Sequence, residues 1–252
     1  MIKIAEKPIL QILSGLGSDK KILDVGGAIA PFKRANYLID YVPYESINWS
    51  QLKGDGETCF SKETYKEFDI CSRAPFPFPD KFFDYSICSH VLEDIRDPLW
   101  VCSELIRISK AGYIEIPSRI YETTFGLEAR GLAGASHHRW IIELKGNILQ
   151  FTFKFMHVHS KVVNRSRIRL QRNDPSNYLR LEWQESFIYE ENWLNSGPEV
   201  FEYFLGRPID EKEKWKIYRK LDPRPFPFPW LSYLKNTNFI FSAIFKAFKR
   251  ND

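Results

Sequence analysis

Short apolar runs that alternate with amphipathic stretches predict an α/β fold in the first half of the chain. Four apolar runs bounded by turn residues have the length of strands, at 21–25, 37–40, 82–89 and 112–117. Helical spacing marks two further stretches, 4–16 and 97–109, and in the second Asp97 would be the N-cap with Pro98 at the first helical position. Strands that alternate with helical connections favour a doubly wound, mostly parallel sheet of the Rossmann-like kind.

The pattern changes after residue 118. A glycine-bearing loop over 126–140 leads to two stretches with strand-like alternation, 148–159 and 178–191. We expect these two stretches to pair as antiparallel edge strands. The C-terminal half would therefore add antiparallel strands to the parallel sheet.

The last sixty or so residues lack the regular alternation of the preceding segments. From residue 192 onward the chain is aromatic-rich and irregular, and 238–250 has the spacing of a basic amphipathic helix. We expect a core domain over 1–191 and a C-terminal extension over 192–252 that packs on it and ends in this helix. Such a helix docks on its own domain or on a partner subunit, or makes peripheral contact with a membrane surface.

Composition narrows the class of protein only slightly. Lys and Arg number 36 and Asp and Glu 32, which leaves a net charge of +4 and no long basic stripe before the C-terminus, so nucleic acid is not an expected partner. The four cysteines show no C-x-x-C spacing, and no apolar run approaches the ~20 residues that span a bilayer. The N-terminus lacks the features of a signal peptide. These features predict a reduced, soluble, cytoplasmic protein and leave its oligomeric state open.

Ligands of parallel sheets bind in the crevice beyond the carboxyl ends of the strands. In this chain that rule selects four places: the turn Asp24–Ala30, Asp40, Ser89 with His90, and Pro117 with Ser118. The first of them, in the sequence KILDVGGAIA, places two adjacent glycines after a buried strand and an acidic residue. A strand followed by an acidic residue and small residues suggests a ligand-binding turn, but such turns usually space their glycines, so a tight turn after a buried strand is the alternative.

Residues 69–117 contain a series of linked motifs. An Asp-containing turn precedes P-F-x-D-x-x-F-D, then a strand ending in Ser-x-His-x-Leu-Glu, a helix led by Asp-Pro, and a K-x-G turn into another strand. The residues in place are Pro77, Phe78, Asp80, Phe83, Asp84, Ser89, His90, Leu92, Glu93, Asp97, Pro98 and Gly112. With KILDVGG and Asp40, the series resembles class I S-adenosylmethionine-dependent methyltransferases of the type 11 group, over residues 20–118.

The resemblance implies S-adenosyl-L-methionine as cofactor. Asp24 with Gly26 and Gly27 would form the turn at the methionine and ribose end, and Ala28 and Ala30 stand where the family has its second and third glycines. Asp40 would accept hydrogen bonds from the ribose hydroxyls. The alternative for both carboxylates is that they only cap turns after buried strands.

Two further pairs of residues complete the implied cofactor site. Asp69 and Ile70 match the position that binds the adenine ring, and Ser89 and His90 would lie near the methionine portion. Asp69 is otherwise an ordinary loop residue, and His90 otherwise hydrogen-bonds locally and does no chemistry.

The resemblance also implies a methyl acceptor, which we expect to be a small molecule, a glycan or a lipid-linked compound methylated on O or N. Residues 119–147 would form an inserted lid over the acceptor. The candidates for a general base are His137, His138 and His90. Asp94 departs from the family, which often has His after the motif's glutamate.

Three alternatives stay open at this point. The chain is a catalytically silent, methyltransferase-like scaffold, or a nicotinamide-dependent oxidoreductase, which also uses a glycine turn. We expect no metal site. The alternative is that His157 and His159, two apart on the predicted strand over 148–159, bind a metal together with His137.

Overall fold

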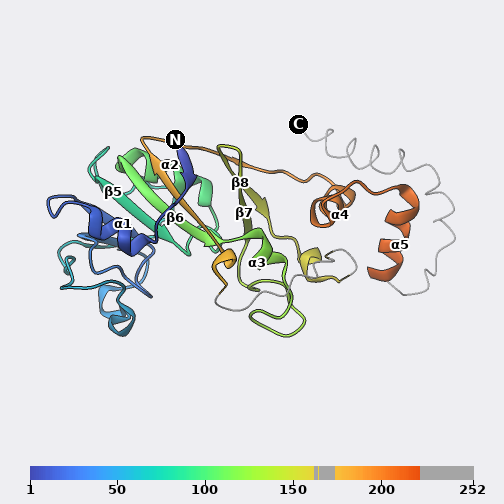
Figure 1. Ribbon diagram of the computed structural model, residues 1–252, viewed down its shortest axis with the longest axis horizontal. Coiled ribbons are helices and arrows are strands. Elements are labelled where there is room, and N and C mark those ends of the chain that lie inside the picture. The colour runs from blue at the N-terminus through green and yellow to red at the C-terminus, as the bar shows by residue number, and fades with distance from the viewer. Residues whose placement is uncertain (162–163, 165–173, 222–252) are drawn as a thin grey trace. The chain divides into compact units, whose positions relative to one another are not determined.

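A seven-stranded, mostly parallel sheet forms the centre of residues 1–210 in the computed structural model (Figure 1). The structure describes residues 1–161, 164 and 174–221, and the chain divides into two units, 1–210 and 211–252. The predicted amphipathic helix at 238–250 lies outside the described residues.

The strand order in this sheet is β1-β9-β6-β5-β2-β3-β4. The strands are β1 (Ile2–Ile4), β9 (Tyr178–Gln184), β6 (Ala111–Pro117), β5 (Tyr85–Ser89), β2 (Ile22–Val25), β3 (Tyr37–Asp40) and β4 (Tyr65–Glu67). β2 to β6 are parallel in their pairings, whereas β9 is antiparallel to both β6 and β1. The predicted doubly wound, mostly parallel sheet with an antiparallel C-terminal strand is confirmed, and its switch point lies between β2 and β5.

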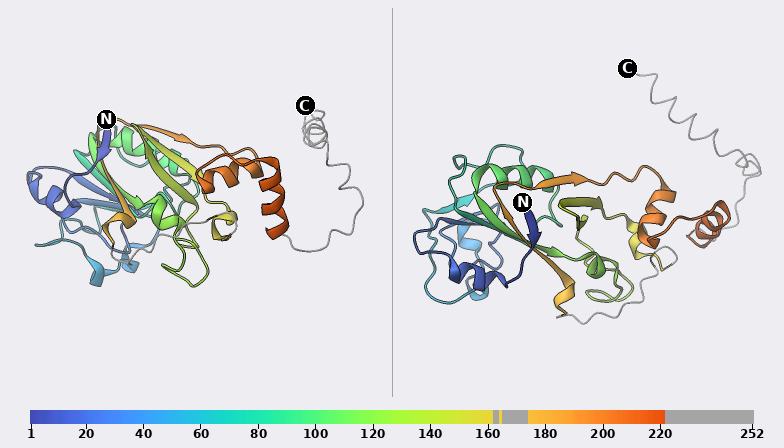
Figure 2. Two further views of the ribbon diagram at one scale, coloured as in Figure 1. Left: turned by 45° about the vertical axis from the view of Figure 1, so that its right-hand side comes forward. Right: turned by 45° about the horizontal axis from the view of Figure 1, so that its top comes forward.

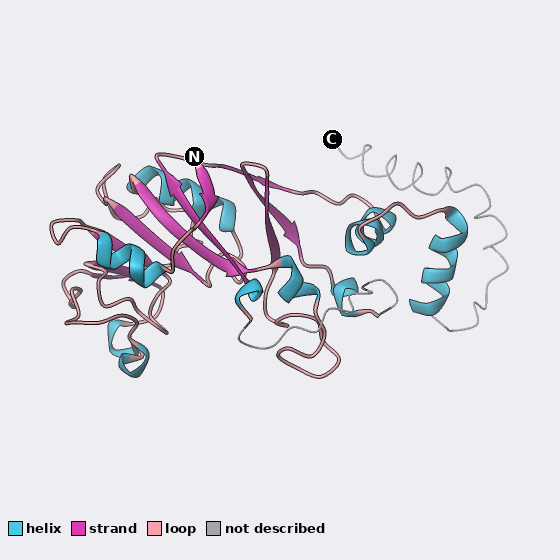
Figure 3. Ribbon diagram, viewed as in Figure 1, coloured by secondary structure: helices cyan, strands magenta, loops and turns pink. Residues whose placement is uncertain are grey.

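Helices cover both faces of the central sheet (Figure 3). α1 (Ile9–Gly15) packs Leu13 into a cluster that contains Ile22, and α2 (Pro98–Ile108) packs Val101 into a cluster that contains Leu23. Ile22 and Leu23 are neighbours on β2 and point to opposite faces, as alternate strand residues must. The apolar run of β2 is therefore buried on both sides.

The helix α2 begins as the sequence predicts. The Asp97 side chain accepts a hydrogen bond of 3.2 Å from the Trp100 backbone N–H, and Pro98 occupies the first turn. α2 ends at Ile108, within one residue of the predicted boundary.

The connections around β3 contain no long helix. Residues 26–36, between β2 and β3, form turns without an α-helix. The β3–β4 connection contains only two 3-10 turns, Tyr44–Ser46 and Trp49–Gln51. β4 escaped prediction because its sequence, Tyr-Lys-Glu, carries two charged residues and has only one buried side chain.

The N-terminal prediction was wrong for residues 4–8. Ile2–Ile4 form β1, which lies along the outer edge of the central sheet (Figure 2) and pairs with Leu181–Trp183 of β9. The helix begins only at Ile9, because Pro8 has no N–H to donate and disfavours helical backbone in the residue before it.

The predicted pairing of 148–159 with 178–191 was right only for 148–151 with 188–191, and these strands are parallel, not antiparallel as predicted. A separate three-stranded sheet has the order β10-β8-β7, with β7 (Trp140–Lys145), β8 (Ile148–Phe153) and β10 (Ile188–Glu191). β8 pairs antiparallel with β7 and parallel with β10, while β9 joins the central sheet. Alternation identified the strands, but it carries no information on the partner of each strand.

Three more helices lie in the described residues: α3 (Arg119–Thr123), α4 (Gly197–Leu205) and α5 (Glu211–Leu221). α5 belongs to the second unit. Two short 3-10 turns also occur: Met156–His159 follows β8, and Pro175–Asn177 directly precedes β9. No helix in the described ranges has the length and apolar character that crossing a bilayer requires.

The packing around Gly112 generates a test of this fold. An added Cβ at Gly112 would lie 2.6 Å from the Ser86 carbonyl oxygen and 2.7 Å from Trp183 Nε1, between the strands on either side of β6. We expect Gly112→Ala to lower the free energy of unfolding by about 1–3 kcal/mol through overpacking. Urea denaturation of both proteins measures the difference.

Gly15 offers a matched control, since no heavy atom lies within 4 Å of the Cβ position there and its backbone is ordinary. Gly15→Ala should change stability by no more than about 0.5 kcal/mol. Equal stability of the wild type and Gly112→Ala would contradict the close packing of β5, β6 and β9.

Candidate functional site

Each of the two adjacent glycines after β2 is required for a different steric reason. Gly26 has φ of 71° and its N–H donates to the Ile39 carbonyl at 2.8 Å, while an added Cβ would lie 2.6 Å from Val91 Cγ2. A Cβ on Gly27 would lie 2.3 Å from Asp24 Oδ2. The turn after β2 therefore requires glycine at both positions.

Two carboxylates hold this turn in place. Asp24 Oδ2 accepts from the Phe32 N–H at 3.0 Å, and Asp40 Oδ2 accepts from the Ala28 N–H at 3.0 Å. Asp40 Oδ1 also accepts from the Val42 N–H at 3.2 Å. Both side chains are buried, at 1% and 5% exposed. Their hydrogen bonds to backbone N–H groups cap the turn, which is the structural role given above as the alternative to cofactor binding. Each carboxylate oxygen keeps a further lone pair for a ligand.

Burial also changes the chemistry of Asp24. Removal from water raises the pKa of its carboxyl to about 7, against the opposing effect of the Phe32 hydrogen bond and of Lys53. The charge on this turn therefore depends on pH near neutrality.

The alanine at position 28 does not obstruct the crevice. Ala28 is buried in an apolar cluster with Leu38, Ile47 and Phe60, so its methyl group packs into the protein. The Ala30 N–H donates to the Gly27 carbonyl at 3.0 Å, which closes the turn.

The sheet brings the predicted cofactor residues to one edge. Val25 at the end of β2 is in register with Ile39 of β3 and Cys88 of β5, and Asp40 is in register with Glu67 of β4. The residues that follow these strand ends are the Gly26–Gly27 turn, Asp69 with Ile70, and Ser89 with His90. Asp69 is exposed, and its Oδ1 accepts from the Cys71 N–H at 2.8 Å, whereas Ile70 is buried in the main core.

His90 lies between two carboxylates. Its Nε2 lies 3.2 Å from Glu115 Oε1, its Nδ1 lies 3.4 Å from Glu93 Oε1, and its backbone has φ of 57°. Burial lowers its pKa, but the bonds with Glu115 and Glu93 outweigh burial and raise the pKa to about 9. A protonated imidazole has no lone pair to accept a proton, so this geometry disfavours His90 as a general base at neutral pH.

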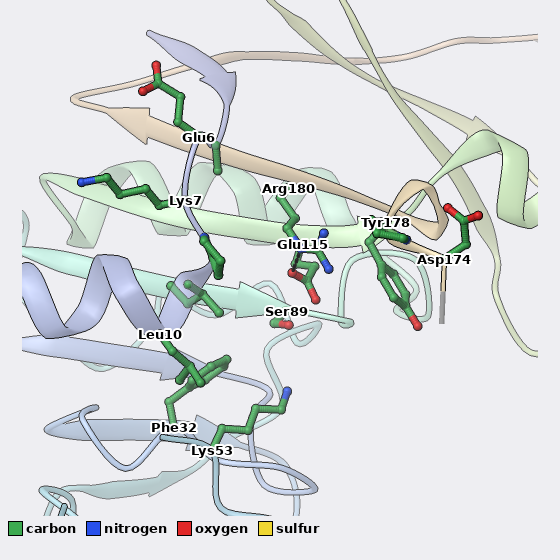
Figure 4. A pocket seen from close by; sticks show the side chains of 14 residues that line it. Glu6, Lys7, Leu10, Phe32, Lys53, Ser89, Glu115, Asp174, Tyr178 and Arg180 are labelled. Carbon is green, nitrogen blue, oxygen red and sulfur yellow. Dashed lines mark hydrogen bonds and ion pairs between the residues drawn. The ribbon is translucent and has the colours of Figure 1, made fainter. Parts of the chain in front are cut away.

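A cleft of about 570 Å³ opens beside this edge, on the face of the sheet that carries α1 (Figure 4). Of the predicted cofactor residues only Ser89 lines it. The other lining residues are Ala5, Glu6, Lys7, Pro8, Ile9, Leu10, Phe32, Lys53, Glu115, Asp174, Pro175, Tyr178 and Arg180. The segment before α1 and the segment before β9 thus form its walls.

Glu115 provides the fixed negative charge in the cleft. Its Oε2 accepts from the Tyr113 hydroxyl at 2.6 Å and from Arg180 Nε at 2.8 Å, in addition to the contact with His90. Burial raises its pKa, but these three partners dominate and lower it to about 2. Glu115 therefore remains ionised throughout the physiological range.

Sequence reasoning missed Glu115, Tyr178 and Arg180. One signal was present: Glu115 interrupts the apolar run Gly-Tyr-Ile-Glu-Ile of a strand predicted to be buried on both faces. Tyr178 and Arg180 are two apart on β9 and share a face, but nothing in the sequence placed β9 next to β6.

His137 and His138 lie outside the cleft, on the loop between α3 and β7. His138 Nδ1 is 2.5 Å from Glu122 Oε1, and Lys154 Nζ pairs with Glu122 Oε2. Burial lowers the pKa of His138, but the bond with buried Glu122 outweighs it and raises the pKa. His137 is 60% exposed.

A tyrosine pair lies between His138 and the cleft. The ring of Tyr121 is 6.3 Å from that of His138 and 6.3 Å from that of Tyr178, which lines the cleft. His138 is therefore linked to the cleft through the rings of Tyr121 and Tyr178.

The alternative metal site at His157 and His159 was wrong in its geometry. Met156–His159 form a 3-10 turn, so the two histidines do not share the face of a strand. His159 Nδ1 accepts from the Ala133 N–H at 3.1 Å, and the His157 ring packs against Phe201. Neither belongs to a group of potential metal ligands within the described part of the chain.

The pair of His90 and Glu115 predicts how stability depends on pH. The pKa of His90 is raised from 6.5 to about 9, so its contribution to stability is complete below pH 6.5 and is lost as pH rises through about 9. Unfolding by urea at pH values across this range should show the loss in the wild type. His90→Asn, which suits the positive φ, should flatten this part of the profile. Parallel profiles for the two proteins would exclude the pair as the cause.

Comparison with known proteins gives distant structural matches. No model of a known family matches the sequence, and no curated protein matches it. A solved S-adenosylmethionine-dependent methyltransferase from Mesorhizobium loti is 16% identical over 46% of this chain and 55% of its own, with a TM-score of 0.33.

Two further solved structures match at the same level. A SAM-dependent methyltransferase from Aquifex aeolicus is 18% identical over 44% of this chain and 62% of its own, with a TM-score of 0.29. The [4+2]-cyclase SpnF is 14% identical over 42% of this chain and 43% of its own, with a TM-score of 0.27. The chain spans roughly half the length of such structures, and likeness of this degree carries no argument about activity.

Proposed function

We propose that this protein is an S-adenosyl-L-methionine-dependent methyltransferase that acts on oxygen or nitrogen of a small-molecule, glycan or lipid-linked acceptor. The observation that carries the proposal is the glycine turn at the switch point of the sheet, which two carboxylates brace and no α-helix follows. This turn, rather than any single catalytic residue, discriminates between classes of cofactor.

Dinucleotide cofactors place a pyrophosphate at the N-terminus of the helix that follows the glycine turn. Residues 26–36 contain no such helix, so the dipole and free N–H groups that would bind the phosphates are missing from this connection. Asp40 adds negative potential instead, and Asp24 does so in its ionised form. The turn therefore favours a cofactor that is cationic and free of phosphate over a nicotinamide dinucleotide.

The cleft supports the same proposal by its size and its polar lining. A volume of about 570 Å³ falls within the range that accommodates nucleoside-sized ligands. Ser89 and the Tyr178 ring offer a hydroxyl and an aromatic edge to such a ligand (Figure 4), while the charge of Glu115 is already paired with Arg180 and His90.

The chemistry that such a site must perform is limited. The methyl group of a sulfonium is already activated, so the protein has to align acceptor, methyl and sulfur and to exclude water. The segment 5–10 forms one wall of the cleft, and we assign the lid over the acceptor to residues 119–147. Gly126, Gly131 and Gly134, all at positive φ, would act as its hinges.

Binding without turnover is the second candidate function, because the oxygens of Asp24 and Asp40 already accept backbone hydrogen bonds. A methyltransferase-like scaffold would retain the turn for the same structural reason. Formation of S-adenosylhomocysteine with any acceptor distinguishes the enzyme from the scaffold.

Calorimetric titration of the purified chain with S-adenosylmethionine and S-adenosylhomocysteine tests the proposal. We expect binding in the micromolar range, and Asp40→Asn should weaken it at least tenfold, about 1.4 kcal/mol, because the ribose loses a charged acceptor. No binding by the folded wild type, or binding of NAD instead, would refute the proposed cofactor.

Asp84 provides the matched control for Asp40. It also accepts a backbone N–H, from Lys21 at 3.1 Å, but it precedes β5 and so lies at the opposite edge of the sheet. Asp84→Asn should leave the affinity unchanged. Equal weakening by both substitutions would mean that the loss comes from the fold and not from the site.

A further inference from the structure

Three potential metal ligands converge where the loop before β7 meets the loop before α2. Asp94 Oδ1 lies 3.8 Å from His137 Nε2 and 3.8 Å from His138 Nε2. Among the described residues, Asp94, His137 and His138 form a group whose ligand atoms all lie within 4.8 Å of one another. The two histidines are adjacent in sequence, and a turn at residues 136–137 directs both rings to the same point.

We propose that Asp94, His137 and His138 bind a divalent transition-metal ion of the zinc class. Two imidazoles and one carboxylate are a donor set that Zn²⁺ and Co²⁺ accept and that Mg²⁺ and Ca²⁺, which prefer oxygen, do not. Ligand atoms around tetrahedral zinc are separated by about 3.4 Å. Small side-chain movements from 3.8 Å would complete the site.

The groups behind the two rings support this assignment. His138 Nδ1 faces Glu122 Oε1 at 2.5 Å, and His137 Nδ1 faces Glu128 Oε1 at 3.7 Å. A carboxylate on Nδ1 orients the ring of a metal-binding histidine and leaves Nε2 to bind the ion. Both histidines thus present Nε2 to Asp94 and Nδ1 to a carboxylate. Glu122 is fixed in turn by buried Lys154.

One carboxylate oxygen of this group has no hydrogen-bond partner. Asp94 Oδ1 is a buried atom without such a partner, and His137 Nε2 and His138 Nε2 each lie 3.8 Å from it. Buried polar atoms are normally paired, so such a group needs an explanation, and a bound ion supplies one. The carboxylates of Asp94, Glu122 and Glu128 face the two histidines.

An ion at this position would join two parts of the structure. Asp94 lies in the connection between β5 and α2, whereas the histidines lie in the loop 124–139. The ion would therefore fix that loop to the connection between β5 and α2. His137 and Asp94 are 60% and 39% exposed, which leaves the remaining coordination positions open to water or to an acceptor oxygen. When bound, such an ion lowers the pKa of a coordinated hydroxyl. The assignment replaces a general-base role for both histidines.

The test does not depend on the proposed methyltransferase activity, since it requires neither cofactor nor acceptor. The full chain is treated with chelator, dialysed, and titrated separately with Zn²⁺, Co²⁺ and Mg²⁺ by calorimetry. We expect one Zn²⁺ or Co²⁺ per chain, visible absorption typical of low-coordinate Co²⁺, and a higher melting temperature with the ion. Asp94→Asn and His137→Asn should each weaken binding at least a hundredfold, and Glu128→Gln by about tenfold.

His157→Gln is the matched control, because this histidine lies outside the group and packs on Phe201. It should bind Zn²⁺ like the wild type. Both Asp94→Asn and His137→Asn alter partly exposed residues, and their melting temperatures should equal that of the metal-free wild type. The proposal is overturned by the absence of a stoichiometric ion, by preference for Mg²⁺, by undiminished binding in Asp94→Asn and His137→Asn, or by loss of binding in His157→Gln.

Discussion

The site depends on the hydrogen bonds that two carboxylates make to the turn after β2. A crossover helix would normally satisfy the N–H groups of this connection, but residues 26–36 form no α-helix. Asp24 and Asp40, from adjacent strand ends, accept the N–H groups of Phe32 and Ala28 instead. Because the acceptor oxygens are buried, these bonds are shielded from competing water, and they fix the backbone of a very short connection.

Two further carboxylates also hold neighbouring groups in place by hydrogen bonds and ion pairs. Glu115 holds His90, Tyr113 and Arg180 together beneath the cleft, and Glu122 holds His138 and Lys154 beneath the loop before β7. Half-buried Glu115 and buried Glu122 each have cationic partners, as the burial of a charge requires. The tyrosine pair of Tyr121 and Tyr178 lies between the two clusters. Acidic side chains thus organise three places in the region that we assign to catalysis: the turn after β2, the cluster around Glu115 and the cluster around Glu122.

Local sequence patterns predicted those helices and strands whose formation depends on interactions between residues close in the chain. Apolar runs located β3 to the residue and β2 to within one residue, and an N-cap with a following proline located α2. The N-terminal helix was overextended because β1 exists only through its pairing with β9, a contact between distant parts of the chain. The strand over 140–145 was missed because part of it lay in a stretch interpreted as a loop, and its pairing with β8 became evident only in three dimensions.

The sequence by itself determined which residues follow the carboxyl ends of the parallel strands, because strand order within a doubly wound unit follows from short, right-handed connections. Asp24, Gly26, Asp40, Ser89 and His90 could be identified in this way. Only the tertiary structure decided that β9 lies beside β6 and brings Arg180 to Glu115, and that His137 and His138 face Asp94. Those contacts join residues 43 to 65 positions apart in the chain, and no local pattern encodes them. Sheet pairing and loop docking, which depend on the fit of whole surfaces, therefore completed the site.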